Sequence, residues 1–179
     1  MITIQEAEDD LLTWVQPRPF TRSYELRSNG HVLSRLQWGK PLGSLATVES
    51  ADGEWSFKRI GFLRPRVTVR VPGAGTDRAI FHPNWGGGGK LELADGRGFR
   101  LISTNFWRSE WAFTDEEGNQ VVCFRPKYGL ARGGAQVEIG PEGHSVPDLS
   151  LLVALGWYLM ILMADDMAVT SAVVVAGTA

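Results

Sequence analysis

The chain has 179 residues, of which 44% are hydrophobic and 21% are charged, and its formal net charge is -2. These values predict one globular domain over residues 1–179 that can bury its own core, and they exclude a disordered, highly charged chain. The near-neutral charge gives no overall attraction to polyanions, so we expect no nucleic-acid partner.

The single cysteine, Cys123, allows no intramolecular disulfide and no cysteine-based zinc site. The first ten residues lack the basic flank and apolar run of a secretory signal. We therefore expect a cytoplasmic protein, and association with a membrane stays open.

Most of the chain alternates between apolar, β-branched runs and turn dipeptides. Residues 4–15 have the spacing of a short amphipathic helix. Beyond them, Asn29-Gly30, Asp52-Gly53 and Asp95-Gly96 tolerate the positive φ angles of tight hairpins. The runs between turns predict ten strands, at residues 23–26, 31–38, 45–49, 55–60, 67–71, 90–93, 99–103, 110–113, 121–125 and 135–139, with 78–81 as a weaker eleventh. Short strands at a spacing of about ten residues favour a sandwich or barrel over βαβ units.

A row of arginines follows one of these strands. Side chains alternate between the two faces of a strand, so residues 64–71 place valines on one face and Arg64, Arg66 and Arg70 on the other. Residues 58–108 hold ten basic and three acidic residues, a net of +7, while the rest holds eight basic and seventeen acidic, a net of -9. The basic region is either a patch for an anionic partner or a surface neutralised by acidic neighbours from other strands.

Residues 149–164 predict a helix, with Asp148 as its N-cap and Asp165-Asp166 at its end. Apolar side chains occupy every side of this helix, so protein or lipid must enclose it. A membrane span needs about 20 apolar residues, and this run has sixteen. Enclosure by the sheet is our expectation, and a membrane anchor or intermolecular packing are the alternatives. The tail after Met167 is expected to be frayed or a weak last strand.

This combination resembles the superfamily of LURP-one-related proteins, the tubby C-terminal domain and phospholipid scramblases. The residues that carry the resemblance are 149–164 with Asp165-Asp166, and the hairpin series with Asn29-Gly30 and Asp95-Gly96. The resemblance implies a mostly β fold, a closed antiparallel barrel of about twelve strands around a central hydrophobic C-terminal α-helix.

The same resemblance implies a lipid partner. Tubby-like domains bind phosphoinositides through basic surface residues, scramblases are associated with membrane lipid, and the LURP-one-related branch has no established activity. The ligand residues that follow from it here are Arg64, Arg66 and Arg70. A scramblase-like calcium segment and a cysteine-rich palmitoylation stretch are both missing from the sequence.

No motif in the sequence predicts a catalytic residue, a metal site or a cofactor. The glycine run 86–89 lacks the first glycine of a phosphate loop and the Ser or Thr after Lys90, so we expect a flexible connection or a close strand approach. His31, His82 and His144 lack ligand spacing.

Three further features also have structural interpretations. Adjacent helical residues point about 100° apart, so Asp165 and Asp166 do not converge, and a polar helix end at a barrel mouth is expected. Cys123 lies in an apolar strand and is expected to be buried. The seven tryptophans are expected to fill the core, with a ligand pocket or base stacking as the alternative, and an extended backbone would put Trp107 and Trp111 on one face.

These observations favour a non-enzymatic binding domain for an anionic lipid headgroup or a protein partner. A small-molecule binder or enzyme with a pocket at the barrel mouth is one alternative. A protein anchored in the membrane by its C-terminal helix is the other.

Overall fold

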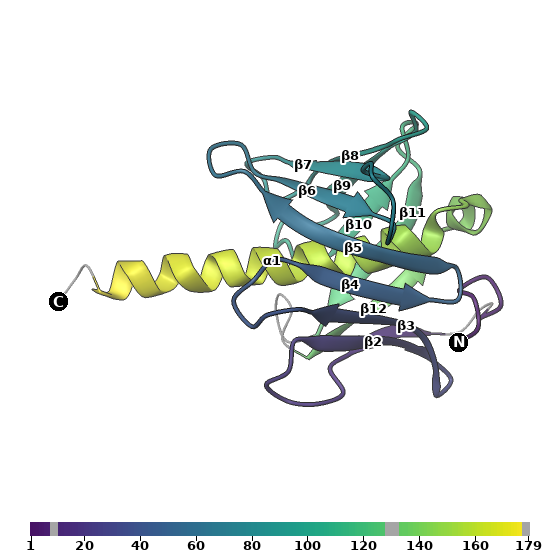
Figure 1. Ribbon diagram of the computed structural model, residues 1–179, viewed down its shortest axis with the longest axis horizontal. Coiled ribbons are helices and arrows are strands. Elements are labelled where there is room, and N and C mark those ends of the chain that lie inside the picture. Colours follow the sequence, from purple (N-terminus) through teal and green to yellow (C-terminus); the bar gives the residue numbers. More distant parts are fainter. Residues whose placement is uncertain (8–10, 128–132, 177–179) are drawn as a thin grey trace.

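The computed structural model describes residues 1–7, 11–127 and 133–176, and it forms a closed barrel of antiparallel strands around one long helix (Figure 1). The barrel strands are β1 (Leu12–Val15), β2 (Ser23–Ser28), β3 (His31–Trp38), β4 (Ala46–Ser50), β5 (Gly53–Ile60), β6 (Arg66–Arg70), β7 (Ala79–Pro83), β8 (Gly89–Leu93), β9 (Gly98–Ser103), β10 (Trp111–Thr114), β11 (Gln120–Pro126) and β12 (Gly134–Ile139). A short 3-10 helix, η1 (Pro141–Ser145), leads into α1 (Leu149–Ala176). The fold class expected from the sequence is confirmed.

Each strand pairs with its neighbours in the chain, and β1 closes the ring against β12. The closing register places Val15 opposite Gly134. Only glycine fits at this position, because its φ is +136° and an added Cβ would overlap the carbonyl oxygen of Trp14. Since all neighbouring strands are antiparallel, successive connections alternate between the two ends of the barrel.

The first half of α1 fills the interior of the barrel. Residues 149–162 are all buried, and the strands surround them (Figure 1). Trp157 stacks on Trp14 with ring centroids 6.3 Å apart, and Tyr158 stacks on Trp38 at 5.4 Å. Large aromatic rings therefore fill the layer between helix and wall, as a barrel this wide requires.

One glycine sets how closely α1 approaches the wall. An added Cβ on Gly156 would lie 2.5 Å from Cε2 of Phe124 on β11 and 3.0 Å from Cε1. Real Cβ atoms do not approach carbon this closely, so the Phe124 ring occupies the space that a side chain would need.

The prediction for the C-terminal boundary of the helix was wrong. α1 continues for 28 residues through Asp165 and Asp166 to Ala176, beyond the expected end at residue 164, and the tail is neither frayed nor a strand over this range. In Figure 1 the last turns project far beyond the barrel. The two carboxylates do not end the helix, because they lie at the barrel mouth and find arginine partners there.

The expected N-terminal helix was also wrong in part. Residues 12–15 form β1, which no strand prediction covered, and residues 4–6 form a turn. Residues 8–10 of that prediction lie outside the described residues. The amphipathic spacing arises instead because Leu12 and Trp14 both face the barrel interior, at the alternate spacing of a strand.

Candidate functional site

The end of the barrel where α1 leaves carries surface features that the packing of the core does not explain. The connections β1–β2, β3–β4, β5–β6, β7–β8, β9–β10 and β11–β12 all lie at this end, because the strands alternate in direction. We call their described residues, 16–22, 39–45, 61–65, 84–88, 104–110, 127 and 133, the exit rim. The connections at the other end, together with residues 140–148, form the opposite rim.

Two ion pairs hold α1 where it passes the exit rim. The Arg22 guanidinium donates to Asp165 at 2.5 Å, and Arg59 at the end of β5 donates to both carboxylate oxygens of Asp166, at 2.7 and 2.9 Å. Arg22 also lies over the Trp38 ring, 4.8 Å from its centroid. The two aspartates therefore lie at a barrel mouth, as expected, although the helix does not end there.

Large apolar side chains stand fully out into solvent around this point. Their exposed fractions run from 83% to 107%, so they make almost no contact with the barrel. We call this set the apolar crown: Phe20, Leu42, Phe62, Leu63, Trp85, Phe106 and Trp107. Among the described residues, five of the six connections contribute at least one member, and Met167 and Val169 of α1 add exposed apolar surface in the middle. Apolar surface gathered at one end of a molecule marks an interaction site.

Exposed basic side chains lie between the members of the apolar crown. Five of them have no ion pair among the described residues: Arg18, Lys40, Arg64, Arg108 and Lys127. In total the exit rim holds six basic residues and one acidic residue. Glu110 is that acid, and Arg125 neutralises it at 2.9 Å. The exit rim is thus both apolar and positively charged, apart from the paired carboxylates of α1.

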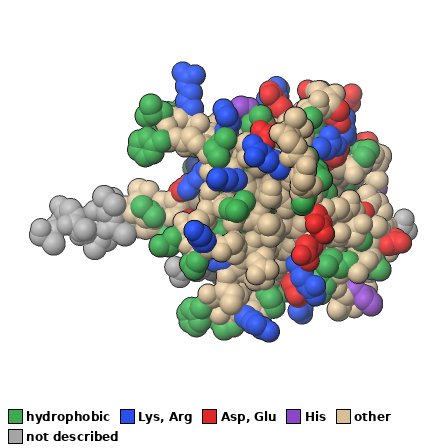
Figure 2. Space-filling view, viewed as in Figure 1, with side chains coloured by type: hydrophobic (Ala, Val, Ile, Leu, Met, Phe, Trp, Pro, Cys, Tyr) green, Lys and Arg blue, Asp and Glu red, His purple; other side chains and the backbone are tan. Residues whose placement is uncertain are grey.

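The opposite rim has the reverse character. Its connections hold eight acidic and two basic residues, and they are built from small polar turns. In Figure 2 the red side chains gather mainly on the half away from the projecting helix, while green and blue side chains surround the helix base. The barrel therefore carries a charge and polarity gradient along its axis.

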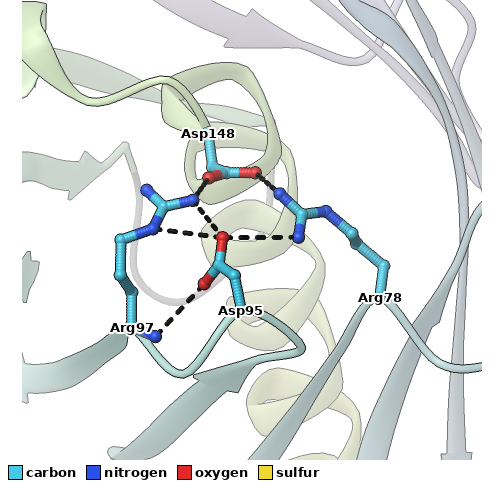
Figure 3. A network of polar contacts seen from close by, with 4 residues as sticks. All are labelled: Arg78, Asp95, Arg97 and Asp148. Carbon is cyan, nitrogen blue, oxygen red and sulfur yellow. Dashed lines mark hydrogen bonds and ion pairs between the residues drawn. The ribbon is translucent and has the colours of Figure 1, made fainter.

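Both basic residues of the opposite rim serve to fix the start of α1. Asp148 accepts hydrogen bonds from Arg78, at 2.7 Å, and from Arg97, and Asp95 binds Arg97 at 2.6 Å (Figure 3). The side-chain and backbone hydrogen bonds from Arg97 lower the pKa of Asp95 to about 2. This cluster lies at the opposite end from the apolar crown and holds α1 in the barrel.

The three arginines predicted as ligand residues do not form one site. Arg64 belongs to the exit rim, Arg66 begins β6 just beside it, and Arg70 ends β6 at the opposite rim, where it pairs with Asp77 at 2.5 Å. The alternating faces hold for Arg66 and Arg70, whereas Arg64 precedes the strand. The predicted row is therefore divided between the two ends of the barrel.

The wider basic region of residues 58–108 is only partly neutralised. Arg59, Arg70, Arg78, Lys90 and Arg97 have acidic partners. Within the described part of the chain, five others have no ion pair: Lys58, Arg64, Arg66, Arg100 and Arg108. Acidic neighbours therefore neutralise half of the basic residues of this region, and the other half stay without an ion pair among the described residues.

The tryptophans divide in the same way. Trp14, Trp38, Trp111 and Trp157 are buried, and Trp55 is half-buried against the core, as expected. The core prediction was wrong for Trp85 and Trp107, which project from the exit rim because residues 104–110 form a loop, so Trp107 and Trp111 do not share a strand face.

The remaining candidate residues have structural roles. Cys123 is buried, as expected, and this burial raises the pKa of its thiol to about 12, with a further contribution from Glu110. In the glycine run, a Cβ on Gly88 or Gly89 would overlap a neighbouring backbone carbonyl, which confirms the close strand approach. No group of three or more potential metal ligands occurs among the described residues.

A repeating signal in the sequence marks the exit rim, although strand prediction passes over it. Every second connection contains a large apolar residue near proline, glycine or a basic residue, as in Pro-Arg-Pro-Phe, Lys-Pro-Leu, Gly-Phe-Leu-Arg-Pro and Asn-Phe-Trp-Arg. Four of the five connections between them contain Asn-Gly, Asp-Gly or Glu-Gly, and the fifth, β6–β7, contains Pro-Gly. Once the strands are known to alternate, this pattern assigns all apolar turns to one end.

By length and composition α1 is also a candidate membrane span over residues 149–170, and 61% of its most apolar stretch is buried inside the barrel. No family model, curated protein or solved structure matches this chain.

Proposed function

We propose that this protein is a peripheral membrane-binding domain that docks end-on, with the exit rim against a bilayer containing anionic lipid. The observation that carries the proposal is the coincidence, at one end of the barrel, of the apolar crown, the unpaired basic residues and the projecting turns of α1. Aromatic side chains favour the boundary between headgroups and acyl chains.

The energies involved are sufficient for reversible docking. A large apolar side chain gains about 1.5–3 kcal/mol when it leaves water completely, and each crown residue is free to do so. A Lys or Arg near an anionic membrane surface adds about 1 kcal/mol. Two kinds of attraction thus act together, as stable attachment of a peripheral protein requires.

The projecting part of α1 fits one leaflet. Residues 167–176 form ten helical residues, which span about 15 Å at 1.5 Å per residue. This is half of the roughly 30 Å hydrocarbon core. Asp165 and Asp166, paired with Arg22 and Arg59, would then remain at the level of the headgroups, where charged groups keep their hydration.

Vesicle co-sedimentation at low salt tests the proposal, with phosphatidylcholine vesicles compared to vesicles that also contain phosphatidylserine. We expect binding to the anionic vesicles, and a strong loss of it in the crown variant F62S/W85S/W107S. These side chains are exposed, so the fold should survive. The control variant L11S/V71S removes exposed apolar side chains from the opposite end and should bind normally.

A second pair of variants separates end-on docking from docking on the barrel wall. K40Q/R64Q/R108Q removes three charges from the exit rim, and K58Q/K90Q/R100Q removes three from the outer wall. The rim variant should lose more binding, and equal loss would contradict end-on docking. Equal binding of the wild type to neutral and anionic vesicles would refute a role for anionic lipid. Alkaline carbonate should release the protein, whereas retention would mean that α1 crosses the bilayer.

A further inference from the structure

A cleft of about 540 Å³ opens between two adjacent connections of the exit rim. Leu63, Arg64 and Pro65 of the β5–β6 connection line one side. The other side is formed by the end of β7 and the β7–β8 connection, with His82, Pro83, Asn84 and Trp85. The cleft therefore lies on the surface that the proposed docking places against lipid headgroups.

Three hydrogen-bond donors line this cleft. Arg64 is exposed and has no ion pair among the described residues, so its guanidinium is available. His82 has a side chain that is 49% exposed. The Asn84 side-chain oxygen accepts from the Gly86 N–H at 2.8 Å, and its amide NH₂ group, which lies close to Gly88, is the third donor at the cleft wall. A fork of guanidinium donors with neighbouring N–H groups suits a phosphate.

Positive charge continues from the cleft along the outer wall. Val67 pairs with Phe81, so the preceding residue, Arg66, lies beside His82 on the neighbouring strand. His82 in turn pairs with Lys90. Glu92 lies 3.9 Å from Nε2 of His82 and pairs with Lys90 at 2.9 Å, and Asp166, close to Pro65 and Asn84, pairs with Arg59. Glu92 thus leaves Arg64 and Arg66 unneutralised.

Apolar tips flank the cleft on both sides. Phe62 and Leu63 are 96% and 90% exposed on one connection, and Trp85 is fully exposed on the other. With both tips in the leaflet, the donors between them would lie at the depth of the lipid phosphates. We propose that this cleft binds the phosphate headgroup of one anionic glycerophospholipid, with Arg64 and His82 as its ligands. This inference rests on the proposed membrane docking and assigns a specific headgroup site within it.

Dihexanoylphosphatidic acid below its micelle concentration is a suitable probe, because its headgroup is a phosphate alone. Binding is followed by titration calorimetry and by amide chemical shifts of the β7–β8 connection. We expect the cleft variant R64Q/H82Q to bind about tenfold more weakly, as the loss of charge-assisted hydrogen bonds implies. The matched rim variant K40Q/R108Q should change the affinity no more than about twofold, because its charges act only at a distance.

The possible outcomes distinguish failure of the cleft proposal from failure of the docking proposal. Equal weakening by the two variants would overturn the cleft while leaving end-on docking intact. Equally tight binding of glycerol 3-phosphate would show a site for free phosphate and overturn the assignment to lipid, as would equally tight binding of dihexanoylphosphatidylcholine. If the wild type fails to bind anionic vesicles at all, the proposed function itself fails. Thermal unfolding of both variants checks that neither loses its fold.

Discussion

The substitution Gly156→Ala distinguishes a helix enclosed by the barrel from the same helix in lipid or water. The added methyl group would meet the Phe124 ring, with Cε2 at 2.5 Å and Cε1 at 3.0 Å. That ring is fully buried, and it packs edge-on against Phe113 with centroids 6.5 Å apart, so it has little room to move.

Two opposing effects set the size of the change. Forcing an extra methyl group into a packed core costs about 1–3 kcal/mol. Replacing glycine by alanine inside a helix returns about 1 kcal/mol. We expect a net loss of up to about 2 kcal/mol in the free energy of unfolding. For a chain of this length, each kcal/mol lowers Tm by about 2–4 °C, so Tm should fall by up to about 8 °C.

Circular dichroism during thermal and urea unfolding measures this effect. Phe124→Leu removes the ring atoms that the methyl group would meet, so the double variant should be more stable than the sum of the two single changes predicts. A rise of Tm in Gly156→Ala would refute the reasoning, because helix propensity alone would then govern this position. Strict additivity with Phe124→Leu would refute it as well.

Three further predictions concern the ends and wall of the barrel. Asp148→Asn should lower the free energy of unfolding by about 1–2 kcal/mol, because Arg78 and Arg97 lose a shared charged acceptor but stay partly hydrated. Urea titration measures this change, and an unchanged midpoint would contradict it. Because the pKa of Asp95 falls from 3.8 to about 2 on folding, its stabilising effect is complete above about pH 4 and is lost as the pH falls to about 2. Asp95→Asn should therefore flatten the dependence of Tm on pH in that window, and an unaltered slope would count against the assignment. Cys123, whose thiol pKa is raised to about 12 by burial, should resist alkylation at pH 8 in the native protein and react fully in urea; rapid native labelling would contradict its burial.

The two ends of α1 have different tasks. At the opposite rim, Asp148 binds two arginines and fixes the start of the helix. At the exit rim, Asp165 binds Arg22 of the β1–β2 connection and Asp166 binds Arg59 of β5, and the helix continues beyond them. One helix thus supplies the core of the barrel and, in the proposed docking, a membrane contact whose depth the ion pairs limit.

The sequence by itself determined most of the secondary structure, whereas closure into a barrel was implied only by the resemblance. Turn dipeptides and alternating apolar residues located eleven of the strands, and the all-round apolar run required that α1 be enclosed. These are local properties, since backbone conformation in a turn and side-chain alternation along a strand depend on a few neighbouring residues. β1 was missed because four residues, Leu12–Val15, are too few to separate strand spacing from helical spacing.

Only the tertiary structure decided where the chemistry lies. Closure of the barrel sends Arg64 and Arg70 to different ends although they are six residues apart in the chain. It also gathers Phe20, Trp85 and Trp107 around one mouth from connections far apart in sequence. The end of α1 was predicted wrongly for the same reason. Asp165 and Asp166 indicate a helix end in the sequence, and only the tertiary structure places Arg22 and Arg59 beside them. Charge pairing and exposure depend on residues that are distant in the sequence. These residues become neighbours only when β1 pairs with β12 and closes the barrel.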